Sequence, residues 1–238
     1  SKELHHGCTI VIQNIVKLLK LNNIIIYKTI SVEDNWKEIK NIDEIIKKSD
    51  LVIVNGEGTI HHNQVRGKNL IQIGEFCKKF KTPTYLINCT YQDNDKDFFA
   101  KYLKYFNLIS VRESLSKNQL DSINIKSHIV PDLSFYSNYN ELNIKHKNNQ
   151  TYLISDSVYF EISKFLLNFS YINKNFIFIP ILSPFILKQI TPIKILSYIK
   201  YHLKKIVFIL FKFNPQNHYE IRYFGLNDYK KYILKLKN

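Results

Sequence analysis

Short apolar runs alternate with segments of helical periodicity along the first two-thirds of the chain, and this alternation constrains the fold most. In residues 8–20, Val11, Ile15 and Leu18 recur at helical spacing and share one face. The same reading predicts strands at 23–30, 50–55, 82–89, 107–112 and 126–132 and helices at 35–49, 67–80, 95–106 and 113–122. Because such strands need helices on both faces, the sequence predicts an α/β fold with a Rossmann-like, doubly wound parallel sheet.

A polar stretch without apolar periodicity, residues 138–150, separates this part from a second one. The elements expected after it are a strand and a helix at 151–169, a strand at 175–182 and a lysine-rich helix at 227–238. We therefore predict two Rossmann-like units, an N-terminal one at residues 1–140 and an incomplete C-terminal α/β unit at 150–238.

The segment 183–213 is apolar and aromatic, with a lysine every few residues. No uncharged stretch in it approaches the roughly 20 residues that a membrane-spanning helix needs. One interpretation is a basic amphipathic surface that lies on an anionic membrane. The other is a set of core helices whose lysines extend to solvent. The sequence leaves both interpretations open.

The formal net charge of +14 indicates either an anionic partner or a compositional bias toward lysine. Lysines are spread along the chain and no nucleic-acid-binding motif is present, so we expect no nucleic-acid partner. The cysteines Cys8, Cys77 and Cys89 form no CxxC pair and are expected to be reduced thiols of a cytosolic protein. Neither a metal nor a cofactor is expected.

The stretch DLVIVNGEGTIHHN, residues 50–63, contains the first candidate site. Gly56 and Gly58 flank Glu57 where a buried strand is expected to end, and ligands bind at such strand ends in open α/β sheets. Glycine there permits a positive φ and close backbone approach, and free N–H groups bind anions. A full GxGxxG or GK[ST] motif is absent. Glu57 is a candidate general base or hydrogen-bond acceptor for a sugar hydroxyl; the alternative is a capping residue.

Two histidine pairs accompany this turn. His61 and His62 are adjacent and lack the spacing of zinc ligands, so we expect one of them to donate or shuttle a proton beside an anionic ligand. The alternative is two exposed loop histidines. His5, His6 and Gly7 precede the first helix. If a strand precedes Ser1, they form the first strand-to-helix turn and lie at the same sheet edge as the glycines.

Arg112 follows an expected strand in a chain with only three arginines. Its guanidinium offers a bidentate fork for a carboxylate or phosphate, and the alternative is an ion pair with Glu113 or Asp132. Asp132 follows the next strand and is a candidate ligand contact or turn cap. Asp156 or Ser157 is expected to cap the helix in the second unit.

The segments DLVIVNGEGTIHH, ISVRESLS, VPDLSF and ISDSVY, in this order, resemble the polysaccharide pyruvyl transferase family. HHGCTIVIQNIVKLL looks like the first helix of that family. The resemblance implies a two-domain fold similar to GT-B glycosyltransferases. It implies transfer of a pyruvyl group from phosphoenolpyruvate to a sugar hydroxyl, which forms a ketal on a cell-surface polysaccharide of capsule, lipooligosaccharide or exopolysaccharide.

By this resemblance Arg112 binds the phosphate or carboxylate of the donor, and the turn at Gly56, Glu57 and Gly58 lines the acceptor side of the cleft. Further donor contacts are expected from Gly56, Gly58, His6 and Gly7. The catalytic candidates are Glu57, His61 and His62. The acceptor or cleft candidates are His5, Asp132, Asp156 and Ser157. Expected partners are phosphoenolpyruvate or another anionic donor, a polysaccharide or lipid-linked glycan, and an anionic membrane surface.

One departure from the family pattern concerns its Arg-x-His motif in the second domain, which this chain does not show. Arg222 is followed by Tyr and Phe, and residues 217–238 look like the segment just before the motif. We therefore expect a fragment that lacks an N-terminal strand and the C-terminal Arg-x-His segment. The alternatives are glycosyl or phosphoryl-type transfer to the same glycans, or a truncated protein that binds a glycan or partner without catalysis. The expected location is the cytoplasm, at the inner face of the cytoplasmic membrane.

Overall fold

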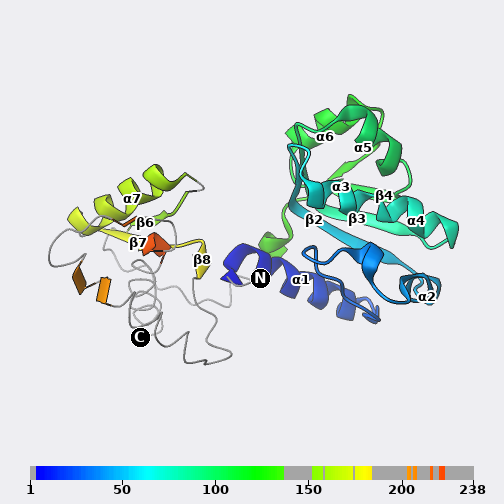
Figure 1. The fold of residues 1–238 in the computed structure, drawn as a ribbon, viewed down its shortest axis with the longest axis horizontal. Coiled ribbons are helices and arrows are strands. Elements are labelled where there is room, and N and C mark those ends of the chain that lie inside the picture. Colours follow the sequence, from blue (N-terminus) through cyan, green and yellow to red (C-terminus); the bar gives the residue numbers. More distant parts are fainter. Residues whose placement is uncertain are drawn as a thin grey trace. The chain divides into compact units, whose positions relative to one another are not determined.

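A computed structural model gives the fold (Figure 1). The residues that it describes are 4–136, 152–157, 159–173, 175–183, 203–204, 206–207, 215–216 and 220–222. The chain divides into two compact units. We call residues 10–137 the N-terminal unit, and residues 1–9 with 138–238 the C-terminal unit.

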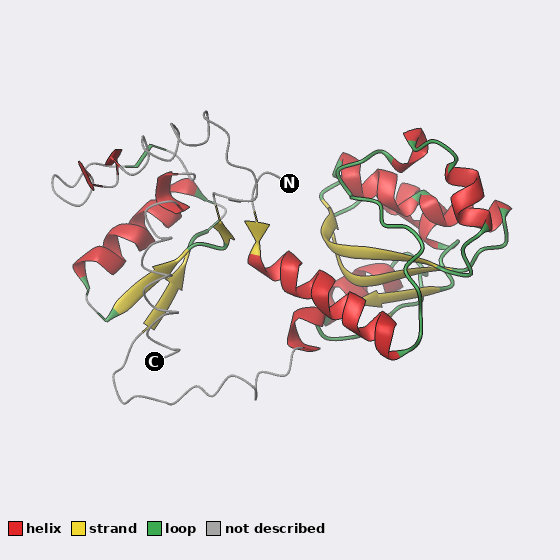
Figure 2. Ribbon diagram, turned by 90° about the horizontal axis from the view of Figure 1, so that it is seen from below, coloured by secondary structure: helices red, strands yellow, loops and turns green. Residues whose placement is uncertain are grey.

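The N-terminal unit is built on a four-stranded parallel sheet (Figures 1 and 2). Its strands, in spatial order, are β2 (Val52–His61), β3 (Thr84–Gln92), β4 (Leu108–Val111) and β5 (His128–Ile129). Glu57 is in register with Cys89, and Cys89 is in register with Val111. Val111 is paired in turn with Ile129. The carboxyl ends of the four strands therefore meet at one edge, where the predicted site residues follow them.

Helices cover both faces of this sheet, as the apolar strands require. The helices of this part of the chain are α1 (His6–Leu21), η1 (Trp36–Glu38), α2 (Ile42–Lys47), α3 (Val65–Ile71), α4 (Ile73–Lys79), α5 (Lys96–Leu103), α6 (Ser114–Asp121) and η2 (Leu133–Tyr136). Val54 and Leu86 belong to the core under α2–α6. The alternate residues Ile53 and Ile87 face α1 across an apolar cavity of about 160 Å³. This alternation is the period of two that strands impose.

The C-terminal unit is also α/β. Its described elements are β6 (Tyr152–Ser155), α7 (Phe160–Ile172) and β7 (Phe176–Ile179), with β1 (Leu4–His5) and β8 (Leu182–Ser183). Strands β6 and β7 are parallel neighbours, and the crossover between them contains α7. A small core of Leu167, Phe178 and Ile221 lies beneath α7. Two parallel sheets with crossover helices confirm the predicted Rossmann-like α/β class.

Three element predictions were wrong. The expected strand at 23–30 forms no strand, and Ile25 in it is 90% exposed. The expected helix at 35–49 divides into η1 and α2, because Asn41 adopts a left-handed conformation with φ of 61°. The expected helix at 67–80 divides into α3 and α4 at Gln72.

The turn into α1 also differs from expectation. The residues before this helix form β1, which pairs antiparallel with β8 and belongs to the C-terminal unit rather than to the four-stranded sheet. The side chains of His5 and His6 lie outside the described residues. Most of the segment 183–213 and the expected helix 227–238 lie outside them too. Among the described helices, none is long and apolar enough to cross a membrane.

Candidate functional site

Strand β2 does not end at Asn55, as the sequence suggested, but continues through the Gly-Glu-Gly turn to His61. Its register with β3 shifts between Glu57 and Ile60, so the turn is a bulge within the strand. The positive φ expected at the glycines is wrong: it occurs at Glu57, with φ of 35°. The backbone amides of this turn are partly used in pairing with β3.

The two glycines have different surroundings. A Cβ built on Gly56 would come within 2.8 Å of the Cys89 Cβ atom and 3.1 Å of Leu86 Cδ1. Gly56 therefore lets β2 approach β3 closely, and its close contact is with protein. A Cβ on Gly58 would meet no atom within 4 Å. Gly58 has the open space that a ligand would need to reach the backbone.

A row of carboxamides connects Glu57 to the loop after β5. Asn55 Nδ2 donates to Glu57 Oε2 at 3.3 Å, and Asn88 Nδ2 is 3.5 Å from Asn55 Oδ1. Asn88 Oδ1 accepts from the Leu133 backbone N–H at 3.0 Å. Asn14 Nδ2 of α1 donates to the Leu133 carbonyl at 2.7 Å. These amides hold the strand ends, the loop and α1 together.

The sequence analysis missed this row of amides. Asn55 and Asn88 each end an apolar run, VIVN and YLIN, and an asparagine amide within a sheet covered by helices requires hydrogen-bond partners. Asn88 is 3% exposed and has φ of 53°, a conformation that asparagine tolerates better than most residues. The repeated asparagine was the signal that could have revealed the row.

Arg112 lies at the carboxyl end of β4, where the sequence placed it. Its Nε donates to Thr90 Oγ1 at 3.0 Å, and NH2 also contacts this hydroxyl. Its NH1 donates to Asp132 Oδ2 at 2.6 Å. Three strand ends, those of β3, β4 and β5, thus contribute to one cluster. The ion-pair alternative stated from the sequence is present here, with Asp132 as the partner.

The charges of this cluster are fixed by its contacts. Burial alone would raise the pKa of Asp132, but hydrogen bonds from the Ser134 backbone and from Arg112, and the charge of Arg112, lower that pKa overall. The carboxylate therefore remains ionised at neutral pH. The Arg112 side chain is 25% exposed. Three of the five guanidinium N–H groups serve Thr90 and Asp132, so two remain for a ligand among the described contacts.

Glu113, the other expected partner of Arg112, has a different role. It is the N-cap residue of α6, and its Oε1 accepts from the Ser116 hydroxyl. Ser116 is buried, and its hydroxyl oxygen accepts from the Tyr91 backbone N–H at 2.7 Å. Glu113 and Ser116 therefore attach the start of α6 to β3. This attachment anchors on β3 the start of α6, the helix that begins just after Arg112.

His61 and His62 lie at the end of β2, further along the strand than Glu57. Their Nδ1 atoms are 2.9 Å apart, so one donates to the other, and their rings meet edge to face. His62 Nε2 lies 3.4 Å from Asp93 Oδ2. Among the described residues, no hydrogen bond or ion pair joins either histidine to Glu57 or Arg112. The histidines thus form a separate polar group with Asp93 at the same end of the sheet.

In the C-terminal unit, Asp156 is not a helix cap as expected. Its Oδ2 accepts from Arg222 Nε at 2.8 Å and its Oδ1 accepts from the Ile181 backbone N–H. The Asp156 side chain is 1% exposed, so this is a buried ion pair that the sequence did not reveal. Ser157 is not the cap either, because Tyr159 is the N-cap residue of α7. The Ser157 hydroxyl accepts instead from the Tyr159 backbone N–H at 3.2 Å.

The remaining reactive groups do not form a metal or thiolate centre in the part of the chain that the structure describes. No group of three or more His, Cys, Asp or Glu side chains there could hold a metal ion. Burial raises the pKa of the Cys89 thiol to about 12, although the Arg112 charge lowers it. Burial also raises the pKa of Cys77. These two thiols are therefore protonated core residues.

The sheet is parallel and places an arginine, a hydroxyl and a carboxylate at its carboxyl edge, the edge at which open α/β sheets in general bind ligands. The family model of polysaccharide pyruvyl transferases matches residues 6–237, and the chain belongs to this family. It is accordingly a transferase of polysaccharide biosynthesis. The resemblance seen in the sequence is confirmed. Neither the curated proteins nor the solved structures show a significant match to the chain.

Proposed function

We propose that this chain transfers a pyruvyl group from phosphoenolpyruvate to a hydroxyl of a cell-surface polysaccharide or its lipid-linked precursor. The observation that supports the donor assignment is the Arg112 guanidinium held at the strand ends by Thr90 and Asp132. Membership in the polysaccharide pyruvyl transferase family supports the reaction class.

The chemistry of the donor fits an arginine in this setting. Phosphoenolpyruvate carries a phosphate and a carboxylate, and a guanidinium binds either group through two parallel N–H bonds. Thr90 and Asp132 fix the orientation of Arg112, so little conformational entropy is lost when a ligand binds. Asp132 also balances the arginine charge while the site is empty of donor. The partial exposure of Arg112 leaves its outer N–H groups accessible.

Ketal formation requires proton transfers that the nearby residues are suited to perform. Two sugar hydroxyls form C–O bonds to the enol carbon, one of their protons goes to the methylene carbon, and phosphate leaves with the other. In this proposal Glu57 accepts a hydroxyl proton and His61 or His62 supplies the proton to the donor. The hydrogen bond from Asn55 orients the Glu57 carboxylate. Gly58 contributes backbone at the donor side, and the open space above it suits that role.

Other parts of the proposal concern residues outside the N-terminal sheet. His5, His6, Gly7 and Ser157 remain proposed cleft and donor contacts. The domain bounds 1–140 and 150–238 and the GT-B-like arrangement remain predictions. A cytoplasmic location at the inner membrane face is proposed because lipid-linked glycan precursors are membrane-bound, and the net charge of +14 favours an anionic surface.

The proposal is tested by incubating the protein with phosphoenolpyruvate labelled in its pyruvyl carbons and with a lipid-linked or free polysaccharide acceptor. We expect label in the glycan as an acid-labile ketal, detected by mass spectrometry, with release of one phosphate for each pyruvyl group. Label transferred from a nucleotide-sugar instead, with none from phosphoenolpyruvate, would replace pyruvyl transfer by glycosyl transfer. Binding of the glycan without any transfer would support a non-catalytic role.

A further inference from the structure

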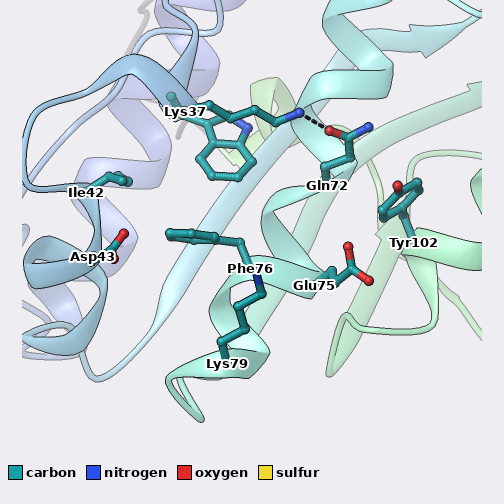
Figure 3. A pocket seen from close by; sticks show the side chains of 9 residues that line it. Lys37, Ile42, Asp43, Gln72, Glu75, Phe76, Lys79 and Tyr102 are labelled. Carbon is teal, nitrogen blue, oxygen red and sulfur yellow. Dashed lines mark hydrogen bonds between the residues drawn. The ribbon is translucent and has the colours of Figure 1, made fainter.

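A second hollow of about 310 Å³ lies on the helical side of the N-terminal unit (Figure 3). Its lining comes from η1, α2, α4 and α5 and from Gln72 between α3 and α4. None of these residues belongs to the strand-end site around Arg112. We call it the aromatic hollow, because Trp36, Phe76 and Tyr102 line it together with polar side chains. Its volume is at the lower end of the range of small-molecule sites.

The aromatic residues are fixed in place. Trp36 Nε1 donates to the Asn69 carbonyl at 2.8 Å, which anchors the indole against α3. The Trp36 and Phe76 rings pack with centroids 5.1 Å apart and a tilt of 53°. Phe76 packs in turn edge to face on Phe80. The hollow therefore has a fixed aromatic wall, with the Lys37 and Lys79 ammonium groups 5.7 Å and 5.6 Å from the Trp36 and Phe76 ring centroids.

The polar side chains around this wall carry balanced charges. Lys37 and Lys79 are matched by Asp43 and Glu75, so the lining has no net charge. The Lys37 ammonium donates to the side-chain oxygen Oε1 of Gln72, and Figure 3 shows this pair above Phe76. Two carboxylates beside the lysines disfavour an anionic ligand. The lysines and the Gln72 amide donate hydrogen bonds, and the carboxylates accept them. This mixture suits hydroxyl groups, because a hydroxyl both donates and accepts.

We propose that the aromatic hollow binds a neutral sugar residue, with a C–H face of the ring against Phe76 and Trp36 and the hydroxyls at Gln72 and Glu75. It would serve as an accessory subsite that holds the glycan acceptor, apart from the anionic donor at Arg112. This inference rests on the proposed function insofar as the acceptor is a glycan. The aromatic hollow has no net charge and suits the neutral sugar, whereas Arg112 at the strand ends suits the anionic donor.

The chain offers a built-in probe, because Trp36 is its only tryptophan. The experiment is a tryptophan-fluorescence titration of the full chain with methyl glycosides of glucose, galactose and N-acetylglucosamine and with short neutral oligosaccharides. We expect a saturable shift with at least one of them. Glu75→Ala and Gln72→Ala should weaken that binding about fivefold or more, the effect of a lost hydrogen bond. Lys78→Ala, on α4 but outside the hollow, is the matched control and should bind as the unmodified chain does.

The inference is overturned if no saccharide in the panel gives a saturable shift up to tens of millimolar, a concentration that would reveal even weak sites. It is equally overturned if inorganic phosphate gives the same shift, or if Glu75→Ala and Gln72→Ala leave the affinity unchanged. Thermal melting of each variant shows whether it is folded. The titration measures saccharide binding without phosphoenolpyruvate or pyruvyl transfer. A negative result therefore contradicts the subsite alone, and a failure of pyruvyl transfer leaves the binding result unaffected.

Discussion

The two glycines in the second half of β2 have different surroundings. Gly56 and Gly58 flank Glu57 symmetrically in the sequence, yet only Gly56 is in close contact with β3. Neither glycine has a positive φ. The strained backbone is at Glu57, and strain of this kind persists only where the surrounding structure enforces it. Packing therefore explains Gly56, whereas Gly58 has open space around its backbone.

This difference predicts opposite outcomes for two matched substitutions. Gly56→Ala should lower the free energy of unfolding by about 1–3 kcal/mol, because the new Cβ would lie 2.8 Å from Cys89 Cβ. Gly58→Ala should change it by less than about 0.5 kcal/mol, because its Cβ meets no atom within 4 Å. Urea denaturation of both variants measures the effect. Equal destabilisation by the two substitutions would contradict the assigned roles.

Asp132 predicts a pH dependence with a definite sign. Its folded-state pKa lies below the ordinary value of 3.8, so the unfolded chain binds more protons between the two pKa values. The stabilisation from this carboxylate is therefore fully present above about pH 4 and is lost as the pH falls through the folded pKa. Urea denaturation of the unmodified chain and Asp132→Asn across this pH range measures the difference. If the difference in free energy of unfolding between the unmodified chain and Asp132→Asn grows as the pH falls, the Arg112 contact does not stabilise the ionised Asp132 carboxylate.

At the level of helices and strands, the segments 50–55, 82–89 and 107–112 were recognisable because each is a short apolar run bounded by polar residues. The run at 23–30 has the same β-branched composition but no strand partner among the described residues, and composition alone cannot show whether a partner exists. The helix breaks at Asn41 and Gln72 were also hidden, because helical periodicity continues across them.

Part of the candidate site was predictable because it lies at the ends of strands that the sequence revealed. Arg112 and Asp132 follow strands that were recognised, so their meeting at the carboxyl edge could be expected, with the ion pair as a stated alternative. The contact of Asn14 and Asn88 through Leu133 joins residues far apart in the chain, and no local pattern encodes it. The Asp156 to Arg222 pair is equally remote in sequence.

The segment 23–30 provides a test at this scale. Its residues 25–30 make no backbone hydrogen bond within the described part of the chain, whereas β2 residues 53–55 pair with β3. Native-state hydrogen exchange should therefore be fast for the amides of 25–30 and slow for those of 53–55. Mass spectrometry of peptic fragments measures both. Equal protection of the two segments would show that 23–30 is paired after all.

At the scale of the whole molecule, the chain combines two α/β units with a family match across residues 6–237. The net charge of +14 does not decide the partner by itself, because lysine is spread over both units. What separates this chain from a generic basic protein is one of its three arginines, Arg112, held at a strand end by a neighbouring hydroxyl and carboxylate. We propose that this arginine binds the anionic donor.

The most direct test is calorimetric titration of phosphoenolpyruvate into the unmodified chain, Arg112→Ala and Arg66→Ala. Arg66 is the matched control, because it is 61% exposed and paired with Glu33 on the surface. We predict that Arg112→Ala weakens donor binding at least tenfold, the loss of a charge-assisted hydrogen bond, with a much smaller effect on melting temperature, while Arg66→Ala binds normally. Unchanged donor affinity in Arg112→Ala, together with a large loss of thermal stability, would show that the arginine is only a structural ion pair and would contradict the account.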